Sequence, residues 1–301
     1  MSSIKDGYGT HRFFIGSGGD YASADVVIIG APMDYTASFR SGSRMGPGII
    51  REMSGVLETY SPNLKGDLED IFLYDHGDLD LYLGNPKKSL DMIYHAAGEV
   101  FGDGKFPIFL GGEHLISLPV IKAAFDKYSG NLVLFHLDAH TDLREEYMGE
   151  TLSHATVIKR CMDFMDGNSI YQFGVRSGLP EEFLLGSQET NFYPFEVLEP
   201  LRNTVNEIGD RPLYVTLDID VVDPAYAPGT GTPEPGGCSA REILRAVHLL
   251  GGCNVIGMDL VEVMGYGDPA GITGVLAAKI IRDALVATAM GSKKGEWGNG
   301  T

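Results

Sequence analysis

Short apolar runs alternate with longer amphipathic segments along most of this 301-residue chain. The runs are rich in Val, Ile, Leu and Phe, and continuous apolar strands are typical of a parallel sheet that is buried on both faces. Helical patterns separate most of the runs, which favours repeated strand–helix units. The pattern predicts strands over residues 25–30, 71–77, 107–112, 131–138, 169–175, 191–195, 213–219 and 254–260.

Two of the intervening helices have clear start signals. Ser239 and Glu242 have the spacing of a capping box, in which each side chain bonds the backbone N–H of the other. Pro47 suits the first turn of a helix over 46–58, where its missing N–H is not needed. Residues 274–290 are apolar but interrupted by Lys and Arg, so they predict a helix packed on the core rather than a membrane span.

Repeated strand–helix units are compatible with an open three-layer sheet or with a closed eight-stranded barrel. In both architectures chemistry collects beyond the carboxyl ends of the strands. No change of composition marks a second domain, so we expect a single domain over residues 1–290. Residues 291–301 lack apolar periodicity and are expected to form a disordered tail.

The chain is acidic, with 41 Asp and Glu against 23 Lys and Arg and a formal net charge of −18. This charge disfavours nucleic acid and anionic membranes as partners and is compatible with a cationic ligand. The three cysteines lack CxxC spacing and are interpreted as free thiols in a reducing compartment. The first residues do not have the pattern of a signal peptide, so we expect a cytoplasmic protein.

Polar side chains that can bind metals follow three of the predicted strands. Because alternate residues of an extended chain share one side, the Asp-x-His-x-Asp of Asp138–Asp142 brings two carboxylates and an imidazole close together. Carboxylates at that range repel one another when buried, so a cation is expected between them. The candidate ligands at the three strand ends are His114, Asp138, His140, Asp142, Asp218 and Asp220.

The chemistry of this set narrows the choice of metal. Carboxylate oxygens with a minority of imidazole nitrogens, and no thiolate, suit Mn²⁺ better than a structural zinc. Six ligands exceed the needs of one ion. The set therefore predicts a pair of manganese ions that share a water-derived ligand.

Longer motifs around these residues resemble the ureohydrolase family, which contains arginases and agmatinases. The chain carries GGEH, HLDAHTDLR, SHAT, TLDIDVVDPAYAPGTGTPEPGG and DLVEV in the family's order, together with GSRMGP. The resemblance runs from about residue 25 to residue 290. It implies the arginase-like three-layer α/β/α fold with a mostly parallel central sheet, two Mn²⁺ per subunit, and a homo-oligomer that is a trimer or hexamer. The closed barrel becomes the second alternative.

The resemblance also implies a role for each residue of the site. His114 and Asp142 would bind one manganese, His140 and Asp220 the other, and the remaining two carboxylates of the set would touch both. A hydroxide shared by the metals would be the nucleophile, and Asp142 would accept a hydrogen bond from it.

Two further residues match catalytic positions of the family. His154, in SHAT, corresponds to the histidine that relays a proton to the leaving amine. Glu262, in DLVEV, corresponds to the carboxylate that pairs with the substrate guanidinium and directs its carbon to the hydroxide. Asp259, in the same motif, is expected to have a supporting role.

The loop after the DAHTD motif bears on substrate choice. In arginases this loop carries polar groups, including an Asn, that hold the α-carboxylate of arginine, whereas here it reads LREEYMGETLSH. A substrate carboxylate would meet like charge at Glu145, Glu146 and Glu150, unless Arg144 turned inward. The decarboxylated substrate agmatine would not, so the sequence predicts an agmatinase that converts agmatine and water to putrescine and urea.

Alternatives remain open at this point. The family usually shows a Pro-x-Tyr-Asp turn after the Glu-Val, and Gly265 and Gly267 occupy its Pro and Tyr positions here. A sister ureohydrolase acting on guanidinobutyrate or another guanidino compound is therefore the main alternative. A non-catalytic metal-binding protein of the same fold and a metal-dependent deacetylase of related architecture are more remote.

Overall fold

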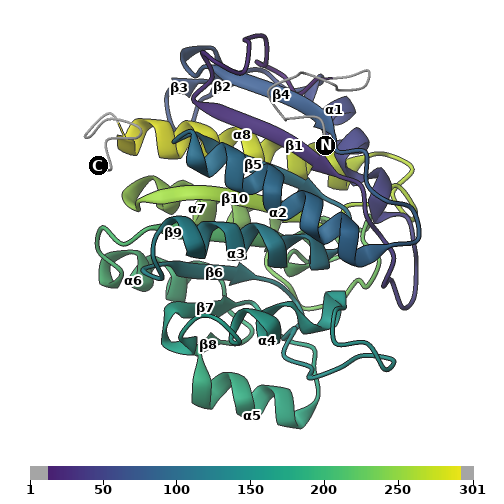
Figure 1. Ribbon diagram of the computed structural model, residues 1–301. Coiled ribbons are helices and arrows are strands. Elements are labelled where there is room, and N and C mark those ends of the chain that lie inside the picture. The colour runs from purple at the N-terminus through teal and green to yellow at the C-terminus, as the bar shows by residue number, and fades with distance from the viewer. Residues whose placement is uncertain (1–12, 293–301) are drawn as a thin grey trace.

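An open, fully parallel sheet of eight strands forms the centre of the protein (Figure 1). The computed structural model describes residues 13–292, so residues 1–12 and most of the expected C-terminal tail lie outside the described range. Across the sheet the order is β4 (Leu73–Asp78), β1 (Val26–Ala31), β5 (Phe106–Gly111), β10 (Val255–Val261), β9 (Leu213–Asp218), β6 (Val133–Leu137), β7 (Ile170–Phe173) and β8 (Asn191–Tyr193).

All eight predicted strands are confirmed, with boundaries that shift by no more than a few residues. The sheet has two free edges, at β4 and β8, so the closed-barrel alternative is wrong. Sequence patterns missed a small antiparallel hairpin, because its strands β2 (Tyr60–Ser61) and β3 (Gly66–Asp67) are too short to show any periodicity.

Helices cover both faces of the sheet and complete three layers (Figure 1). The first face packs against α1 (Gly46–Ser54), α6 (Leu198–Glu207), α7 (Ala240–Leu249) and α8 (Ile272–Ser292). The second packs against α2 (Pro86–Gly102), α3 (Ser117–Lys127) and α4 (Val157–Cys161). The last helix, α5 (Pro180–Glu189), lies beside the edge strand β8.

Within residues 13–292, seven single-turn 3-10 helices connect these elements. They are η2 (Ser43–Met45), η3 (Leu68–Asp70), η4 (His114–Ile116), η5 (His154–Thr156), η6 (Gly167–Ser169), η7 (Ile219–Val221) and η8 (Leu250–Gly252). Three of them, η4, η5 and η7, begin at or next to a candidate site residue.

The predicted helix signals are borne out. Pro47 lies in the first turn of α1. Ser239 and Glu242 form the reciprocal hydrogen bonds of a capping box at the start of α7. The apolar residues of α8 join the core, as expected for this segment. Between residues 13 and 292, no helix has the length and apolar character that crossing a membrane requires.

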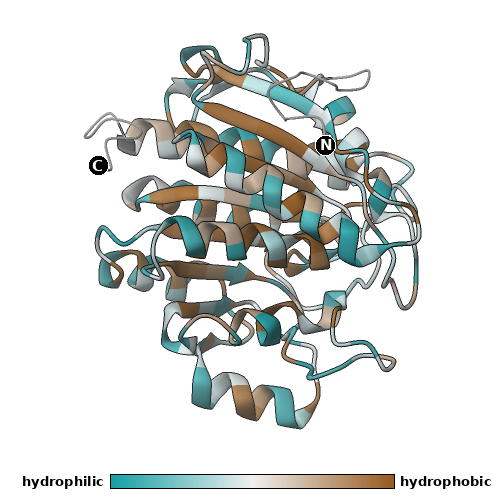
Figure 2. Cartoon of the chain, viewed as in Figure 1, coloured by the Kyte–Doolittle hydropathy of each residue, from teal (hydrophilic) through white to brown (hydrophobic). Residues whose placement is uncertain are grey.

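Strand side chains alternate between two apolar clusters, one on each face of the sheet. In β1, Val26 and Ile28 belong to the first cluster, while Val27 and Ile29 belong to the second. All six residues of β1 are buried, which explains its continuous apolar sequence. Figure 2 shows the same strands as largely hydrophobic between helices of mixed character.

The carboxyl ends of four neighbouring strands carry the candidate site. In spatial order β5, β10, β9 and β6 lie side by side. The chain leaves β5 through Gly112, whose backbone N–H donates to the carbonyl of Ala31 at the end of β1. The two glycines of the GGEH motif therefore let the β5 loop pass directly against the β1 loop.

Gly112→Ala tests this close approach. A Cβ at residue 112 would lie 2.0 Å from the carbonyl oxygen and 2.6 Å from the nitrogen of Met33, and neither backbone atom can move aside cheaply. We expect the substitution to lower the free energy of unfolding by about 2 kcal/mol or more, since overpacking typically costs about 1–3 kcal/mol. Chemical denaturation measures the change.

Gly98→Ala is the matched control. A Cβ there meets no atom within 4 Å, and the residue lies within α2, where Ala is the better helix former by about 0.8–1 kcal/mol. This variant should be as stable as the parent or slightly more stable. Equal stability of the two variants would contradict the proposed contact.

Candidate metal centre

Asp138 lies between two histidines at the end of β6. Its Oδ2 is 2.9 Å from Nδ1 of His114, and its Oδ1 is 3.4 Å from Nδ1 of His140. Each carboxylate oxygen thus faces a different imidazole. This is the geometry expected of a carboxylate that bridges two cations.

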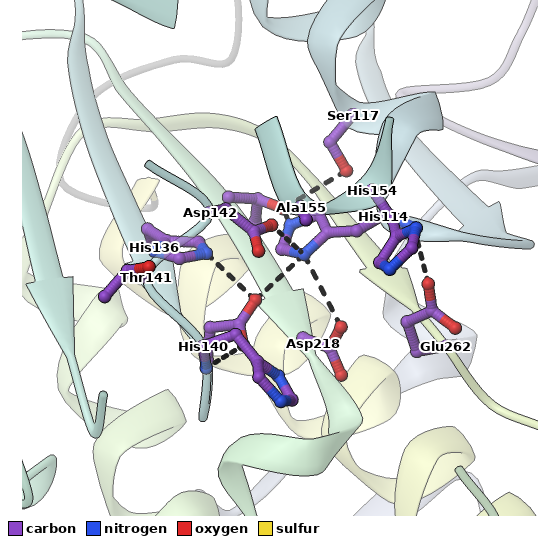
Figure 3. A network of polar contacts seen from close by, with 12 residues as sticks. His114, Ser117, His136, His140, Thr141, Asp142, His154, Ala155, Asp218 and Glu262 are labelled. Carbon is purple, nitrogen blue, oxygen red and sulfur yellow. Dashed lines mark hydrogen bonds and ion pairs between the residues drawn. The ribbon is translucent and has the colours of Figure 1, made fainter. Parts of the chain in front are cut away.

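The first group of candidate ligands gathers around His114. Its Nδ1 lies 3.2 Å from Oδ2 of Asp142 and 3.4 Å from Oδ2 of Asp218. Figure 3 shows these side chains pointing toward one another from three different strand ends. All of them are almost completely buried.

The second group gathers around His140. Its Nδ1 lies 3.0 Å from Oδ2 of Asp220, and both residues lie close to Asp138, which the two groups share. The other Asp220 oxygen accepts a hydrogen bond of 3.1 Å from the backbone N–H of Ala139, which fixes the carboxylate toward β6. The structure therefore brings all six candidate ligands together in two adjoining groups.

Burial makes this cluster electrostatically unfavourable by itself. Burial, together with the nearby Asp138 carboxylate, raises the pKa of Asp142 well above its usual value. Burial, with the carboxylates of Asp220 and Asp138, does the same to Asp218. Nδ1 of His114 and Oδ2 of Asp142 are buried and form no hydrogen bond within the described residues. Buried carboxylates and unpaired lone pairs that converge in this way fit divalent cations.

A chain of hydrogen bonds behind His114 fixes which nitrogen faces the cluster. His114 Nε2 lies 2.9 Å from Oγ1 of Thr216, whose hydroxyl is 2.7 Å from Oδ1 of Asp259. Because the hydroxyl donates to the carboxylate, it accepts from Nε2–H, so that the Nδ1 lone pair faces the cluster. Tyr214 donates to the other oxygen of Asp259 at 2.9 Å. Asp259 thus has the supporting place that its motif implied.

His136 orients Asp138 in a similar way. Its Nε2 lies 3.0 Å from Oδ2 of Asp138, while the Gln172 amide donates to Nδ1 at 3.1 Å and to the carbonyl of Thr141 at 2.8 Å. His136 is near enough to count among the metal-binding groups. Since both of its nitrogens are occupied, we assign it to holding Asp138 in place.

The sequence offered a signal for these supporting residues. His136 and Thr216 each lie two positions before a candidate ligand, Asp138 and Asp218, on the same side of the same strand. Polar side chains at such positions in otherwise apolar strands need buried partners. Gln172 could not be assigned this way, because its partner lies on the neighbouring strand.

Glu262 follows β10, the strand between β5 and β9, and reaches His114. Its Oε1 accepts a hydrogen bond of 2.8 Å from the backbone N–H of His114. Burial and the nearby Glu113 carboxylate raise the pKa of Glu262 to about 8, so at neutral pH its ionised form is disfavoured unless a cation lies beside it. Glu262 and Asp142 have positive φ angles of 62° and 51°, which are uncommon for non-glycine residues.

His154, at the start of η5, faces the same space as these groups. Burial and the neighbouring His140 lower the pKa of His154 to about 4. Its Nδ1 lies 3.1 Å from the Thr36 hydroxyl, and its ring packs edge-on against Tyr147 with 5.5 Å between centroids. Thr36 comes from a loop that no sequence motif connected with this histidine.

A cavity of about 280 Å³ joins these residues. His114, Asp142, His154 and Glu262 all line it, so the metal-binding groups and both candidate catalytic residues face one space. A cavity beyond the strand ends is where α/β sheets bind ligands.

The expectation that Glu145, Glu146 and Glu150 face the substrate is wrong. All three are exposed and none lines the cavity, because the loop turns them to the surface, where Glu145 pairs with Arg160. From this loop, Arg144 lines the cavity instead.

The acidic residue on this wall comes from α5. Glu182 is buried, and its Oε1 lies 3.2 Å from Nε of Arg144. The guanidinium of Arg144 also lies over the ring of Tyr147, 4.8 Å from its centroid. The far wall of the cavity therefore carries one negative and one positive group. The inward turn of Arg144 is the alternative that the sequence left open, whereas Glu182 was not assigned from the sequence.

Known proteins place this arrangement in context. The sequence model described as "Arginase family" matches residues 24–287. The agmatinase of Bacillus subtilis is 48% identical over 278 residues, which cover 91% of this chain and 96% of that protein. The guanidinobutyrase of Pseudomonas aeruginosa is 34% identical, over 87% of this chain and 85% of that protein.

A solved structure shares the fold. The agmatine ureohydrolase of Thermoplasma volcanium superposes with a TM-score of 0.86 at 31% identity, covering 95% of this chain and 97% of that one. The shared fold and the family match thus agree with the resemblance seen in the sequence.

Asp138→Asn tests the bridging position. The substitution removes the charge that lies between His114 and His140, so we expect the protein to lose most of its bound Mn²⁺. Metal analysis after dialysis against Mn²⁺ should give about two ions per chain for the parent protein. Asp91→Asn, an exposed carboxylate on α2, is the charge-matched control and should keep the parent's metal content. Full retention of metal by Asp138→Asn would contradict a bridging role.

Proposed function

Because the chain belongs to the arginase family, we propose that it is a dimanganese hydrolase that converts agmatine and water to putrescine and urea. The observation that carries this proposal is the position of Glu262. Among the described residues Glu262 has no cationic side-chain partner, and it lines the cavity that five of the six candidate ligands also line, all but Asp220. The 48% identity to an agmatinase supports agmatine as the guanidino compound.

The candidate ligands define the metal sites in this proposal. His114 and Asp142 would hold one Mn²⁺ and His140 and Asp220 the other, while Asp138 and Asp218 would help to hold both. Bound there, the two cations supply the Lewis acidity that makes a water nucleophilic at neutral pH.

The protein's own groups bind and orient the substrate. Glu262 accepts two N–H groups of the planar guanidinium, which fixes the central carbon toward the ligand cluster. The His114 N–H holds the Glu262 carboxylate in place before substrate arrives. Asp142 accepts a hydrogen bond from the attacking group, and this stabilises the tetrahedral arrangement that follows.

His154 completes the reaction as the proton relay. When water adds to the guanidinium carbon and the C–N bond to the alkyl chain breaks, the amine leaves and must gain a proton. His154 lines the cavity and contacts no candidate ligand closely enough to serve as one itself. The products are urea and a protonated diamine.

The far wall of the cavity leaves a second substrate class open. Arg144 could bind the carboxylate of guanidinobutyrate, whereas Glu182 could bind the ammonium group of agmatine. These two side chains pair with each other at 3.2 Å, so a substrate must compete with one of them. We favour agmatine because the chain is more similar to the agmatinase than to the guanidinobutyrase.

We also propose that the protein acts in the cytoplasm as a trimer or hexamer. The three cysteines form no disulfide, which supports a reducing compartment. The family resemblance supports the oligomer.

Urea release tests the substrate assignment. The Mn²⁺-loaded protein should release urea from agmatine with a kcat/KM well above those for arginine and guanidinobutyrate. Arg144→Gln frees Glu182, so we expect agmatine turnover to be kept or improved while any guanidinobutyrate turnover falls. Arg160→Gln, a nearby arginine that does not line the cavity, is the control. Preference for guanidinobutyrate would replace agmatine in the proposal.

Glu262→Gln separates a guanidinium hydrolase from other uses of the same metal centre. The amide keeps one acceptor oxygen but presents a donor to the guanidinium N–H groups. We expect kcat/KM for agmatine to fall by roughly 100-fold, about 3 kcal/mol, while metal content and thermal stability stay near normal. Urea production close to that of the parent would show that another residue holds the guanidinium.

A further inference from the structure

The glutamate of the GGEH motif is not a candidate metal ligand, although it is completely buried beside one. Both of its oxygens bind the neighbouring loop. Oε1 of Glu113 accepts the backbone N–H of Tyr35 at 2.9 Å, and Oε2 accepts the backbone N–H of Thr36 at 2.9 Å. The Thr36 hydroxyl also donates to Oε2. Glu113 therefore holds residues 35 and 36 in one position.

The same hydroxyl reaches His154, which is 118 residues away in sequence. Thr36 Oγ1 lies 3.0 Å from the backbone nitrogen of His154 and 3.1 Å from its Nδ1. It thus contacts the histidine at two points and the carboxylate at a third. The loop that Glu113 anchors is in this way connected to the candidate proton relay.

The number of protons in this network fixes their positions. A hydroxyl has one proton to donate. Both Glu113 oxygens act as acceptors, and the Thr36 hydroxyl donates to one of them, so the Thr36 proton points to Glu113. The remaining lone pairs of Thr36 Oγ1 then accept from both His154 nitrogens that face it. This arrangement requires a hydrogen on Nδ1.

Ser153 offers the alternative. Its Oγ lies 3.3 Å from Nδ1 of His154 and also accepts from the backbone N–H of Ala155 at 3.4 Å. If Ser153 donated to Nδ1, the imidazole would carry its hydrogen on Nε2, and the lone pairs of Nδ1 and Thr36 would face each other at 3.1 Å. That contact disfavours the second tautomer.

We propose that Thr36 is a positioning residue that holds His154 with hydrogen on Nδ1 and leaves Nε2 as the nitrogen that exchanges protons with substrate. Glu113 acts one step behind, because it orients the hydroxyl. The inference rests on the proposed function, since it assigns a task to the proton relay. It gives a role to Thr36 in the loop and to Glu113 in the GGEH motif, neither of which is a candidate metal ligand.

Thr36→Val and Thr36→Ser form the matched pair that tests it. Valine keeps the shape but removes the hydroxyl, whereas serine keeps the hydroxyl. We expect Thr36→Val to lower kcat for agmatine by about 10- to 100-fold, with KM and Mn²⁺ content within about threefold of the parent. Thr36→Ser should restore most of the lost kcat. If Thr36→Val does not fold, Thr36→Ala is the second hydroxyl-free variant.

A double-mutant cycle with His154→Asn distinguishes positioning from a general effect on the loop. If Thr36 acts through His154, Thr36→Val should cause no further loss of kcat in the His154→Asn background. The same loss in both backgrounds would overturn the proposal. So would normal kcat in Thr36→Val, or a loss seen in Ser153→Ala instead.

Urea release by the parent protein distinguishes a failure of the proposed function from a failure of the proposed role of Thr36. If it releases no urea from agmatine or the other guanidines, the proposed function fails first. If the parent is active and Thr36→Val equals it, only the role of Thr36 fails.

Discussion

Repulsion among buried carboxylates is the constraint on which this structure depends. Asp138, Asp142, Asp218 and Asp220 lie at the ends of two neighbouring strands, almost fully buried, and the imidazoles near them are those of His114, His136 and His140. Such a cluster destabilises the fold until cations occupy it. The eight-stranded sheet compensates with an apolar core on both faces, so the site can be unfavourable locally while the chain still folds. Metal affinity and fold stability are therefore linked at this edge of the sheet.

Neutral hydrogen-bonding groups give the cluster its geometry. Thr216 holds His114 by Nε2, and His136 holds Asp138 by Oδ2. These partners carry no net charge, so they orient the ligands without reducing the excess of negative charge that attracts cations. Thr36 stands in a comparable relation to His154. In both histidines a threonine hydroxyl binds one ring nitrogen, and the other ring nitrogen is left to face the site.

Local sequence pattern predicted what lies along one strand and missed what lies between strands. The eight strands and the six gathered ligands could be predicted because apolar runs and polar strand ends are properties of short segments. Thr36 could not, since its partner is 118 residues away and only the contact of two loops joins them. The error over Glu145, Glu146 and Glu150 has a related cause. A loop sequence shows charge but not direction, and this loop turns Arg144, not its glutamates, into the cavity.

The role of each charged group in the cavity depends on whether an opposite charge already lies beside it. Cations can neutralise the cluster of six candidate ligands. The metal centre by itself does not determine which electrophile is attacked. The Glu262 carboxylate is then the remaining acidic group without a cation. The His114 N–H holds it in place and its pKa is raised, so a positively charged planar group would stabilise its ionised form. At the far wall Arg144 and Glu182 already neutralise each other. Under the proposed function, Glu262 would therefore select the guanidinium end of a substrate, while the other end would be selected only by the cost of separating one ion pair.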